Sequence, residues 1–324
     1  IRRLPQLVGL RDPARGERRD PLLCGVHHRR GRVIDTWLRR GAAGFRLDVA
    51  DELPDDFIEK IRAAVKRVSP EKFLLGEVWE DATTKFGFNK RRTYLLGKGL
   101  DSVMNYPFKN AVLDFVKGKP AEQAMTEILT ICEHYPAPAM DTALNFLSTH
   151  DTERALTVIA DEPPMAGAAR GQSGAGVTGD AYEEGLLRLR MAYAIIYTPS
   201  GCALPVLRRR DRHAGLPGPL QPGFLPVGCP RTAPASRAGT AGTAPPHLRG
   251  LPHRPAAGLR AEDGILHYQR VGKVETAEII VNRTEHIIVE TLASGKSTEV
   301  NPMGFTIVVE EVGHNPNHSY YDYV

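Results

Sequence analysis

Short apolar runs alternate with segments of helical periodicity between residues 33 and 200, and this alternation constrains the fold of the 324-residue chain most. Residues 44–49 and 73–79 have the length and composition of buried strands, and the segment between them carries apolar side chains at helical spacing. Further strands are predicted at 102–105 and 143–147. Helices are predicted near 110–116 and 126–132, and a last helix is predicted to end near Tyr197. Strand–helix alternation of this kind builds a parallel sheet. The sequence therefore predicts an α/β fold here.

The other parts of the chain differ from residues 33–200 in their pattern of apolar and polar residues. Residues 261–324 contain β-rich runs separated by short turns, at 264–270, 277–282, 286–292 and 305–309, which predict a small antiparallel β domain. Residues 1–32 and 201–260 follow neither period, and the second stretch holds 11 of the 25 prolines. We interpret the chain as four parts divided at these boundaries.

Composition excludes several classes of protein. No run approaches the roughly 18 to 20 apolar residues of a membrane helix, so no membrane segment is predicted. The four cysteines show no CxxC spacing, which argues against a disulfide framework or a zinc site. The chain opens at Ile1 without an apolar signal core, so we interpret it as a fragment whose start is missing and expect a cytoplasmic location.

The net charge of +4 comes from two stretches only. Residues 1–32 and 201–260 each hold nine arginines, against three and one acidic residues, and the remaining 232 residues carry a net charge of about −10. Neither stretch shows helical spacing or interleaved aromatic residues, so nucleic-acid binding is not expected.

Three carboxylates stand at the carboxyl ends of predicted strands: Asp48, Glu77 and Asp151. In a β/α barrel these ends and the following loops converge on the catalytic site. Cleavage of a glycosidic bond needs such a set, with a nucleophile, an acid that protonates the leaving oxygen, and charge beside an oxocarbenium-like transition state. For any one of them, the alternative is an acid that only caps the next helix.

The neighbouring residues favour the catalytic interpretation. Arg46 lies two positions before Asp48, so both side chains project to the same face of a strand. His150 precedes Asp151 and could donate to a sugar hydroxyl, while Trp79 offers an apolar surface for a sugar ring. Taken singly, His150 and Trp79 would more commonly be structural residues.

Three motifs carry a family resemblance. Residues 44–52 (GFRLDVADE), 76–81 (GEVWED) and 146–151 (FLSTHD) resemble the second, third and fourth signature regions of the α-amylase family of glycoside hydrolases. The resemblance covers roughly residues 33–200. The sequence around Asp48 is most similar to the neopullulanase, cyclomaltodextrinase and maltogenic amylase branch.

The resemblance implies a partial (β/α)8 barrel with about strands 4 to 7 intact, followed by the small β domain. It implies a retaining α-glucan hydrolase in which Asp48 is the nucleophile, Glu77 the general acid/base and Asp151 the third carboxylate. Arg46 and His150 match nucleophile-orienting and substrate-binding positions. The partner is an α-glucan oligosaccharide, with no nucleic acid and no membrane. No cofactor is predicted, and no residue is assignable to the calcium known in the family.

The chain departs from the family in two places. The strand that carries Asp48 corresponds to the fourth of eight, yet it begins only 43 residues into the chain. The first signature region is absent, and His27 and His28 are not assigned to it. One permitted codon set for residues 207–212, read one base later, gives Tyr-Gly-Asp-Glu-Thr, which resembles the family's eighth strand. We therefore hypothesise that residues 1–32 and about 202–260 are translated out of frame.

Three alternatives remain open at this stage. The arginine-rich stretches could be a disordered linker. The chain could be a non-catalytic carbohydrate-binding or scaffold remnant of the same family, although all three acids are present. It could also be an enolase-type lyase holding Mg²⁺, although no lysine base stands at a neighbouring strand end. Because open strand edges destabilise a barrel, we expect the chain to be poorly stable and poorly active.

Overall fold

The computed structural model describes residues 33–160, 179–203, 257–272 and 275–311. The segment 1–32, with His27 and His28, and residues 204–256 lie outside the described residues. The reading-frame hypothesis for these two stretches is therefore not addressed by the fold.

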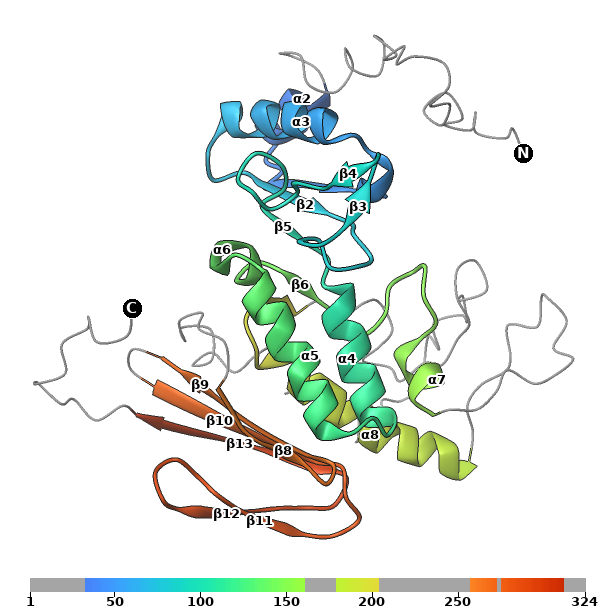
Figure 1. Cartoon of the computed structure of the whole chain (residues 1–324), viewed down its shortest axis with the longest axis vertical. Helices are drawn as coiled ribbons and strands as arrows, with labels where there is room; N and C mark the ends of the chain where they lie inside the picture. Colours follow the sequence, from blue (N-terminus) through green and yellow to red (C-terminus); the bar gives the residue numbers. More distant parts are fainter. Residues whose placement is uncertain (1–32, 161–178, 204–256, 273–274, 312–324) are drawn as a thin grey trace, which may run out of the picture.

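The fold begins with a parallel sheet covered by two helices (Figure 1). Strands β1 (Gly44–Leu47), β2 (Phe73–Gly76) and β5 (Ser102–Val103) are parallel and adjacent in that order. Helices α2 (Val33–Arg39) and α3 (Asp55–Val68) pack their buried faces into the same apolar core. Helix α3 has acids in its first turn and basic residues in its last, as the helix dipole favours.

A connection of 25 residues links β2 to β5. After the turn η2 (Ala50–Glu52) and helix α3, the chain forms β2 and then a short hairpin of β3 (Phe86–Gly87) and β4 (Lys90–Arg91). The hairpin precedes Arg92 and Tyr94, which are both buried.

The start of helix α4 (Tyr106–Lys117) corrects two sequence-based boundaries. A strand was expected to run to Asn105 and a helix to start near residue 110, but β5 ends at Val103. The reason is local: the Asn105 side chain accepts a hydrogen bond from the Phe108 amide at 3.4 Å and caps the helix. Pro107 lies in the first turn, where its missing amide is tolerated.

Strands β6 (Leu144–Asn145) and β7 (Cys202–Ala203) continue the parallel arrangement. A parallel bridge between Met104 and Leu144 joins β6 to the end of β5. The Asn145 amide donates to the Ser200 carbonyl at 2.8 Å and accepts from the Asn105 amide at 3.0 Å. Parallel neighbours therefore follow one another in chain order, β1-β2-β5-β6-β7.

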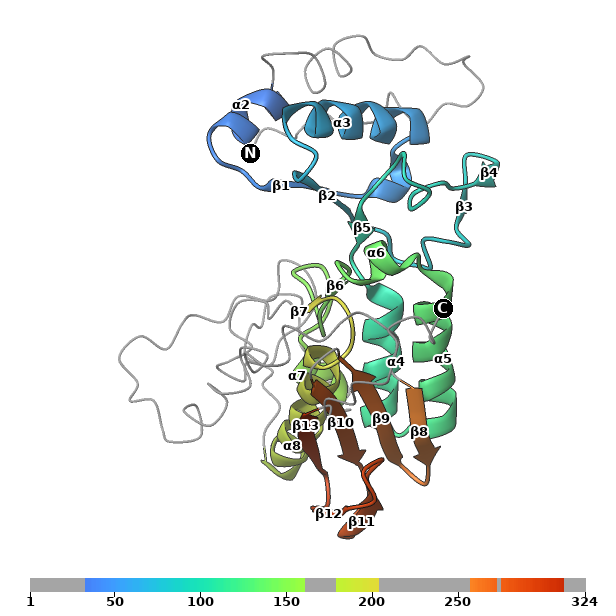
Figure 2. The same ribbon diagram turned by 90° about the vertical axis from the view of Figure 1, so that its left-hand side faces the viewer.

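Four further helices surround the later strands: α5 (Ala121–His134), α6 (Ala137–Met140), α7 (Ala155–Ile159) and α8 (Gly179–Tyr197). Helix α5 extends beyond the predicted 126–132 at both ends. Helices α4, α5 and α8 form the scaffold on which the C-terminal sheet packs (Figure 2).

The C-terminal part is antiparallel, as its sequence pattern predicts. Its main sheet has the order β13-β10-β9-β8, and β11 and β12 form a separate hairpin. The strands are β8 (Ala257–Glu262), β9 (Ile265–Val271), β10 (Glu275–Asn282), β11 (Ile288–Thr291), β12 (Ser297–Val300) and β13 (Gly304–Glu311). Strand β8 begins inside the stretch 201–260 that the sequence leaves without a period.

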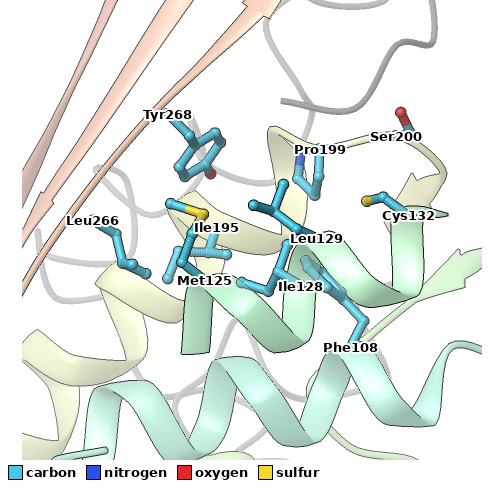
Figure 3. A pocket seen from close by; sticks show the side chains of 10 residues that line it. All are labelled: Phe108, Met125, Ile128, Leu129, Cys132, Ile195, Pro199, Ser200, Leu266 and Tyr268. Carbon is cyan, nitrogen blue, oxygen red and sulfur yellow. The ribbon is translucent and has the colours of Figure 1, made fainter. Parts of the chain in front are cut away.

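Two arginines tie this sheet to the helices. Arg283 Nη1 donates to the Lys119 carbonyl at the end of α4 at 2.8 Å, and Arg270 Nη1 donates to the Thr198 carbonyl after α8 at 2.7 Å. A cavity of about 20 Å³ remains at this interface (Figure 3), and apolar side chains such as Phe108, Met125 and Leu266 line it. It has room for about one water molecule.

The described residues thus form a mixed α/β fold with parallel strands followed by an antiparallel sheet. The parallel strands form no closed barrel within the described residues. No helix in the described part of the chain is both long and apolar enough to cross a membrane.

Candidate active site

One arginine connects the first two predicted catalytic acids. Arg46 Nη1 lies 2.5 Å from Asp48 Oδ1, and Arg46 Nη2 lies 3.0 Å from Glu77 Oε2. Asp48 directly follows β1 and Glu77 directly follows β2, so the parallel pairing of these strands brings the two acids to one edge of the sheet. The role of Arg46 in orienting Asp48 stays a prediction, and the two side chains are in the contact that this role requires.

The two acids have different environments. The Asp48 side chain is 70% exposed, whereas that of Glu77 is 4% exposed. Burial of a carboxylate without partners costs free energy of folding, so the contacts of Glu77 are needed to offset that cost. Besides Arg46, Glu77 Oε2 accepts from the Val49 amide at 2.8 Å, and Glu77 Oε1 accepts from Trp79 Nε1 at 3.1 Å.

The backbone after Asp48 makes this contact possible. Val49 has a φ of 47°, which is uncommon for a β-branched residue. This left-handed conformation turns the chain into η2 and directs the Val49 amide at Glu77 Oε2, to which it donates a hydrogen bond. The Ala50 amide donates to the Glu77 carbonyl at 3.1 Å. The loops after β1 and β2 are therefore joined by their backbones and by the Glu77 carboxylate.

Trp79 lies over a residue that the sequence analysis missed. Its ring stacks on Tyr106, and the Tyr106 hydroxyl donates to Glu77 Oε1 at 3.4 Å. Tyr106 follows the predicted strand 102–105, so the strand-end argument that found the acids could have found it. Met104 was missed too, and its sulfur accepts from Arg46 Nε at 3.2 Å.

Asp151 and His150 lie in the loop after β6. His150 Nε2 is 3.3 Å from Asp151 Oδ2, and both side chains are well exposed. Burial raises the pKa of the Tyr106 hydroxyl to about 12, a hydrogen bond with Thr149 opposes the rise, and the charges of Glu77 and Asp151 add to it. Tyr106 thus lies within electrostatic range of both acids.

The predicted residues fall into two groups. Arg46, Asp48, Glu77 and Trp79 are joined by direct contacts. Asp151 and His150 lie in a separate loop, where His150 Nε2 is 3.3 Å from Asp151 Oδ2, and the charge of Asp151 contributes to the raised pKa of Tyr106. The apolar cavity beneath the C-terminal sheet contains none of these residues.

A metal site is not formed by these acids. Among the residues that the structure describes, no three His, Cys, Asp or Glu side chains are grouped so that they could hold a metal ion. Within those residues, no ligand set for the calcium known in the resembled family is formed.

Part of the chain matches a known protein family. Residues 25–171 match the family described as alpha amylase, catalytic domain. The match begins within the stretch 1–32 that was expected to be out of frame.

Three curated relatives match the same part of the chain. An amylopullulanase of Thermoanaerobacter thermohydrosulfuricus is 38% identical over 146 residues, which make up 40% of this chain and 9% of that protein. A cyclomaltodextrinase of a Bacillus species is 36% identical over 129 residues, 39% of this chain and 22% of that one. Neopullulanase 2 of Thermoactinomyces vulgaris is 37% identical over 127 residues, 39% of this chain and 20% of that one. The chain therefore matches less than a quarter of the length of each.

Solved structures are similar in fold. A cyclic alpha-maltosyl-(1→6)-maltose hydrolase from Arthrobacter globiformis gives a TM-score of 0.68 at 23% identity, over 86% of this chain and 58% of that one. A cyclomaltodextrinase structure gives a TM-score of 0.62 at 25% identity, over 80% of this chain and 40% of that one.

The segment that carries the paired acids is thus similar to the catalytic domain of glycoside hydrolases. Within that class, residues 25–171 match the catalytic domain of the alpha-amylase family, and this match spans less than half of the chain.

Proposed function

We propose that this chain carries the catalytic acids of a retaining α-glucan hydrolase. The observation that supports this most is the Arg46 guanidinium, which contacts Asp48 Oδ1 at 2.5 Å and Glu77 Oε2 at 3.0 Å. A single guanidinium between two carboxylates favours the short separation, about 5 Å, of retaining glycosidases over the wider spacing of inverting ones.

The parallel strands fit consecutive strands of a (β/α)8 barrel. In this proposal β1, β2, β5 and β6 are strands 4 to 7, and β7 occupies the place of strand 8. The chain-order adjacency of these strands and the family match of residues 25–171 support this assignment. Asp48, Glu77 and Asp151 then all follow the carboxyl ends of barrel strands, where barrel enzymes carry their catalytic groups.

The first half-reaction forms a glycosyl-enzyme ester. Asp48 attacks the anomeric carbon, the bond from that carbon to the glycosidic oxygen breaks, and Glu77 gives its proton to the departing oxygen. The exposed position of Asp48 suits attack on an incoming sugar, and the contacts of Glu77 hold it in one orientation. Arg46 keeps the Asp48 carboxylate oriented between turnovers through its contact at 2.5 Å.

The second half-reaction releases the sugar. Glu77 takes a proton from water, the resulting nucleophile attacks the anomeric carbon, and Asp48 leaves as a carboxylate. Asp151 and His150 bind sugar hydroxyls from the loop after β6, and Trp79 supplies a ring surface. Within this scheme the substrate is an α-glucan oligosaccharide, the class to which the printed names of the relatives point.

Turnover by this chain is proposed to be slow. Electrostatic catalysis is strongest where water is excluded, and the Asp48 side chain is 70% exposed. The family match favours this hydrolase over the Mg²⁺-dependent lyase, and the presence of all three acids favours it over a non-catalytic remnant.

The test is hydrolysis of maltooligosaccharides, pullulan and cyclodextrins by the purified chain. We expect slow release of reducing sugar that the Asp48→Asn and Glu77→Gln variants lose. Release that survives Asp48→Asn, or no release from any of the three substrates, contradicts the proposal.

The reading-frame hypothesis is a separate proposal. We infer that residues 1–32 and about 202–260 are encoded out of frame, because their composition departs from that of the flanking sequence. Sequencing the encoding DNA decides it: frameshifted codons that restore family-like sequence support the hypothesis, and codons that do not restore it contradict it.

A further inference from the structure

The loop that follows Glu77 holds the loop that follows Asp48, and Arg92 is at the centre of this contact. The Arg92 side chain is completely buried. Its Nη1 donates to the Asp51 carbonyl at 2.9 Å, its Nη2 to the Leu53 carbonyl at 2.5 Å, and its Nε to Asp55 Oδ1 at 2.7 Å. All three nitrogens of the guanidinium are therefore used on residues 51–55.

The rest of the loop encloses this guanidinium. The rings of Tyr94 and Phe88 lie 4.4 Å and 5.1 Å from the guanidinium carbon, and the Tyr94 hydroxyl donates to Asp51 Oδ1 at 2.8 Å. Phe88 has a φ of 53°, a conformation that an aromatic residue rarely adopts and that needs compensation from its surroundings. A Cβ at Gly87 would lie 3.3 Å from Arg92 Nη1, so the hairpin approaches the guanidinium closely.

The residues that Arg92 holds lead directly to Glu77. Within η2 the Leu53 amide donates to the Ala50 carbonyl at 3.2 Å, so residues 50–53 form one tight turn. At the start of this turn the Val49 amide donates to Glu77 Oε2 at 2.8 Å. One end of the turn is thus fixed on the Glu77 carboxylate and the other on the Arg92 guanidinium.

We propose that Arg92 is a positioning residue for Glu77: by fixing the carbonyls of Asp51 and Leu53, it keeps the Val49 amide directed at Glu77 Oε2. This inference rests on the proposed function in taking Glu77 as the acid/base. It assigns the segment between β2 and β5 a role in catalysis that the signature motifs do not carry, because Arg92 lies outside all three motifs.

Amide hydrogen exchange of the full chain tests the proposal without relying on turnover. Arg92→Met removes all three contacts. Arg92→Lys keeps the charge beside Asp55 but lacks the fork that reaches two carbonyls. We expect both variants to raise the exchange rate of the Val49 amide about tenfold relative to the exchange rates of the amides of β10, a strand that is paired on both sides.

Arg62→Met is the matched control. Arg62 lies in α3 with a side chain that is 20% exposed, and it donates to Asp101 Oδ1 at 2.6 Å and not to residues 51–55. The control should leave the Val49 amide protected relative to the amides of β10. If Val49 and β10 amides accelerate equally in the Arg92 variants, or if Val49 exchange does not change, the proposal is wrong.

A catalytic comparison separates positioning from general destabilisation. A glycosyl fluoride needs no protonation of its leaving group, whereas maltotriose does. A misplaced acid should therefore lower hydrolysis of maltotriose about tenfold relative to α-maltosyl fluoride in Arg92→Lys, and equal losses on both substrates contradict the proposal. If Glu77→Gln leaves hydrolysis unchanged, the proposed function is wrong. The exchange rate of the Val49 amide still tests separately whether Arg92 fixes that amide on Glu77.

Discussion

The indole ring of Trp79 stacks on the ring of Tyr106, with centroids 4.6 Å apart and planes inclined by 13°. Both side chains also donate to the same carboxylate oxygen, Glu77 Oε1. Phe146 supports the stack from an edge, at a centroid distance of 4.8 Å from Tyr106. Glu77, the acid proposed for catalysis, therefore lies against a group of aromatic side chains that follow strands β2, β5 and β6.

Tyr106 is expected to stabilise the fold through its ring more than through its hydroxyl. Tyr106→Phe keeps the stack and removes one hydrogen bond, which should cost about 1 kcal/mol. Tyr106→Ala leaves a cavity in a fully buried position and should cost about 3 to 5 kcal/mol. Urea unfolding followed by circular dichroism measures both, and equal costs for the two variants would contradict the packing described.

Arg46 is expected to matter for rate. Arg46→Met removes the positive charge between Asp48 and Glu77 and should lower hydrolysis of maltooligosaccharides about 100- to 1,000-fold. Arg40→Met is the control, because Arg40 directly follows α2 and contacts the exposed Trp37 ring. Initial rates are compared at matched protein concentration. Equal rates for the Arg46 variant and the unaltered chain would show that Arg46 has no role in catalysis.

Asp101 should make stability depend on acid pH. Burial opposes its ionisation, but hydrogen bonds from Lys66, Arg62 and the Leu74 amide outweigh burial and hold the pKa of the Asp101 carboxyl below its usual 3.8. A carboxyl with a lowered folded pKa stabilises the fold above its unfolded pKa, and this stabilisation is lost as the pH falls below 3.8.

Asp101→Asn should therefore cost about 1 to 3 kcal/mol at pH 7 and less as the pH approaches 3. Chemical unfolding at a series of pH values gives the difference from the unaltered chain. Glu71→Gln, at an exposed position before β2, is the control and should cost little at pH 7. A difference for Asp101→Asn that grows toward pH 3 would reverse the predicted sign.

Asn145 should hold the last parallel strands together. Its buried amide bonds both Ser200 and Asn105, so Asn145→Ala leaves partners without their hydrogen bonds and should cost about 2 to 3 kcal/mol. Asn110→Ala changes an exposed position of α4 and should be close to neutral. Thermal unfolding of the two variants tests this, and similar melting temperatures would indicate that β6 and β7 are not joined as described.

The sequence predicts the positions of Asp48, Glu77 and Arg46 well because their placement depends on local order. Each acid ends an apolar run, and parallel strands bring such ends to one edge. The C-terminal strands at 264–270, 277–282 and 305–309 coincide closely with β9, β10 and β13 for the same reason, since alternation sets their face.

Other features depend on contacts between distant segments and have no local signal. Arg92 lies in a segment without periodicity, and its partners are backbone carbonyls about 40 residues earlier in the chain, so no motif marks it. Strand β12 pairs with β11 after a turn, and β8 lies in a stretch whose composition hides its period. The extent of β5 was overestimated because Asn105 caps α4 instead of extending the strand.

The most direct test of the central claim is covalent trapping of the nucleophile. A 5-fluoro-α-glycosyl fluoride reacts once per site, so slow turnover does not prevent detection of a retained sugar ester. We predict that peptide mass spectrometry finds the added sugar on Asp48, that Asp48→Asn abolishes it, and that Glu77→Gln still permits it because fluoride leaves without an acid. A chain that acquires no sugar, or acquires it at another residue, would contradict the assignment of Asp48 as the nucleophile of a retaining hydrolase.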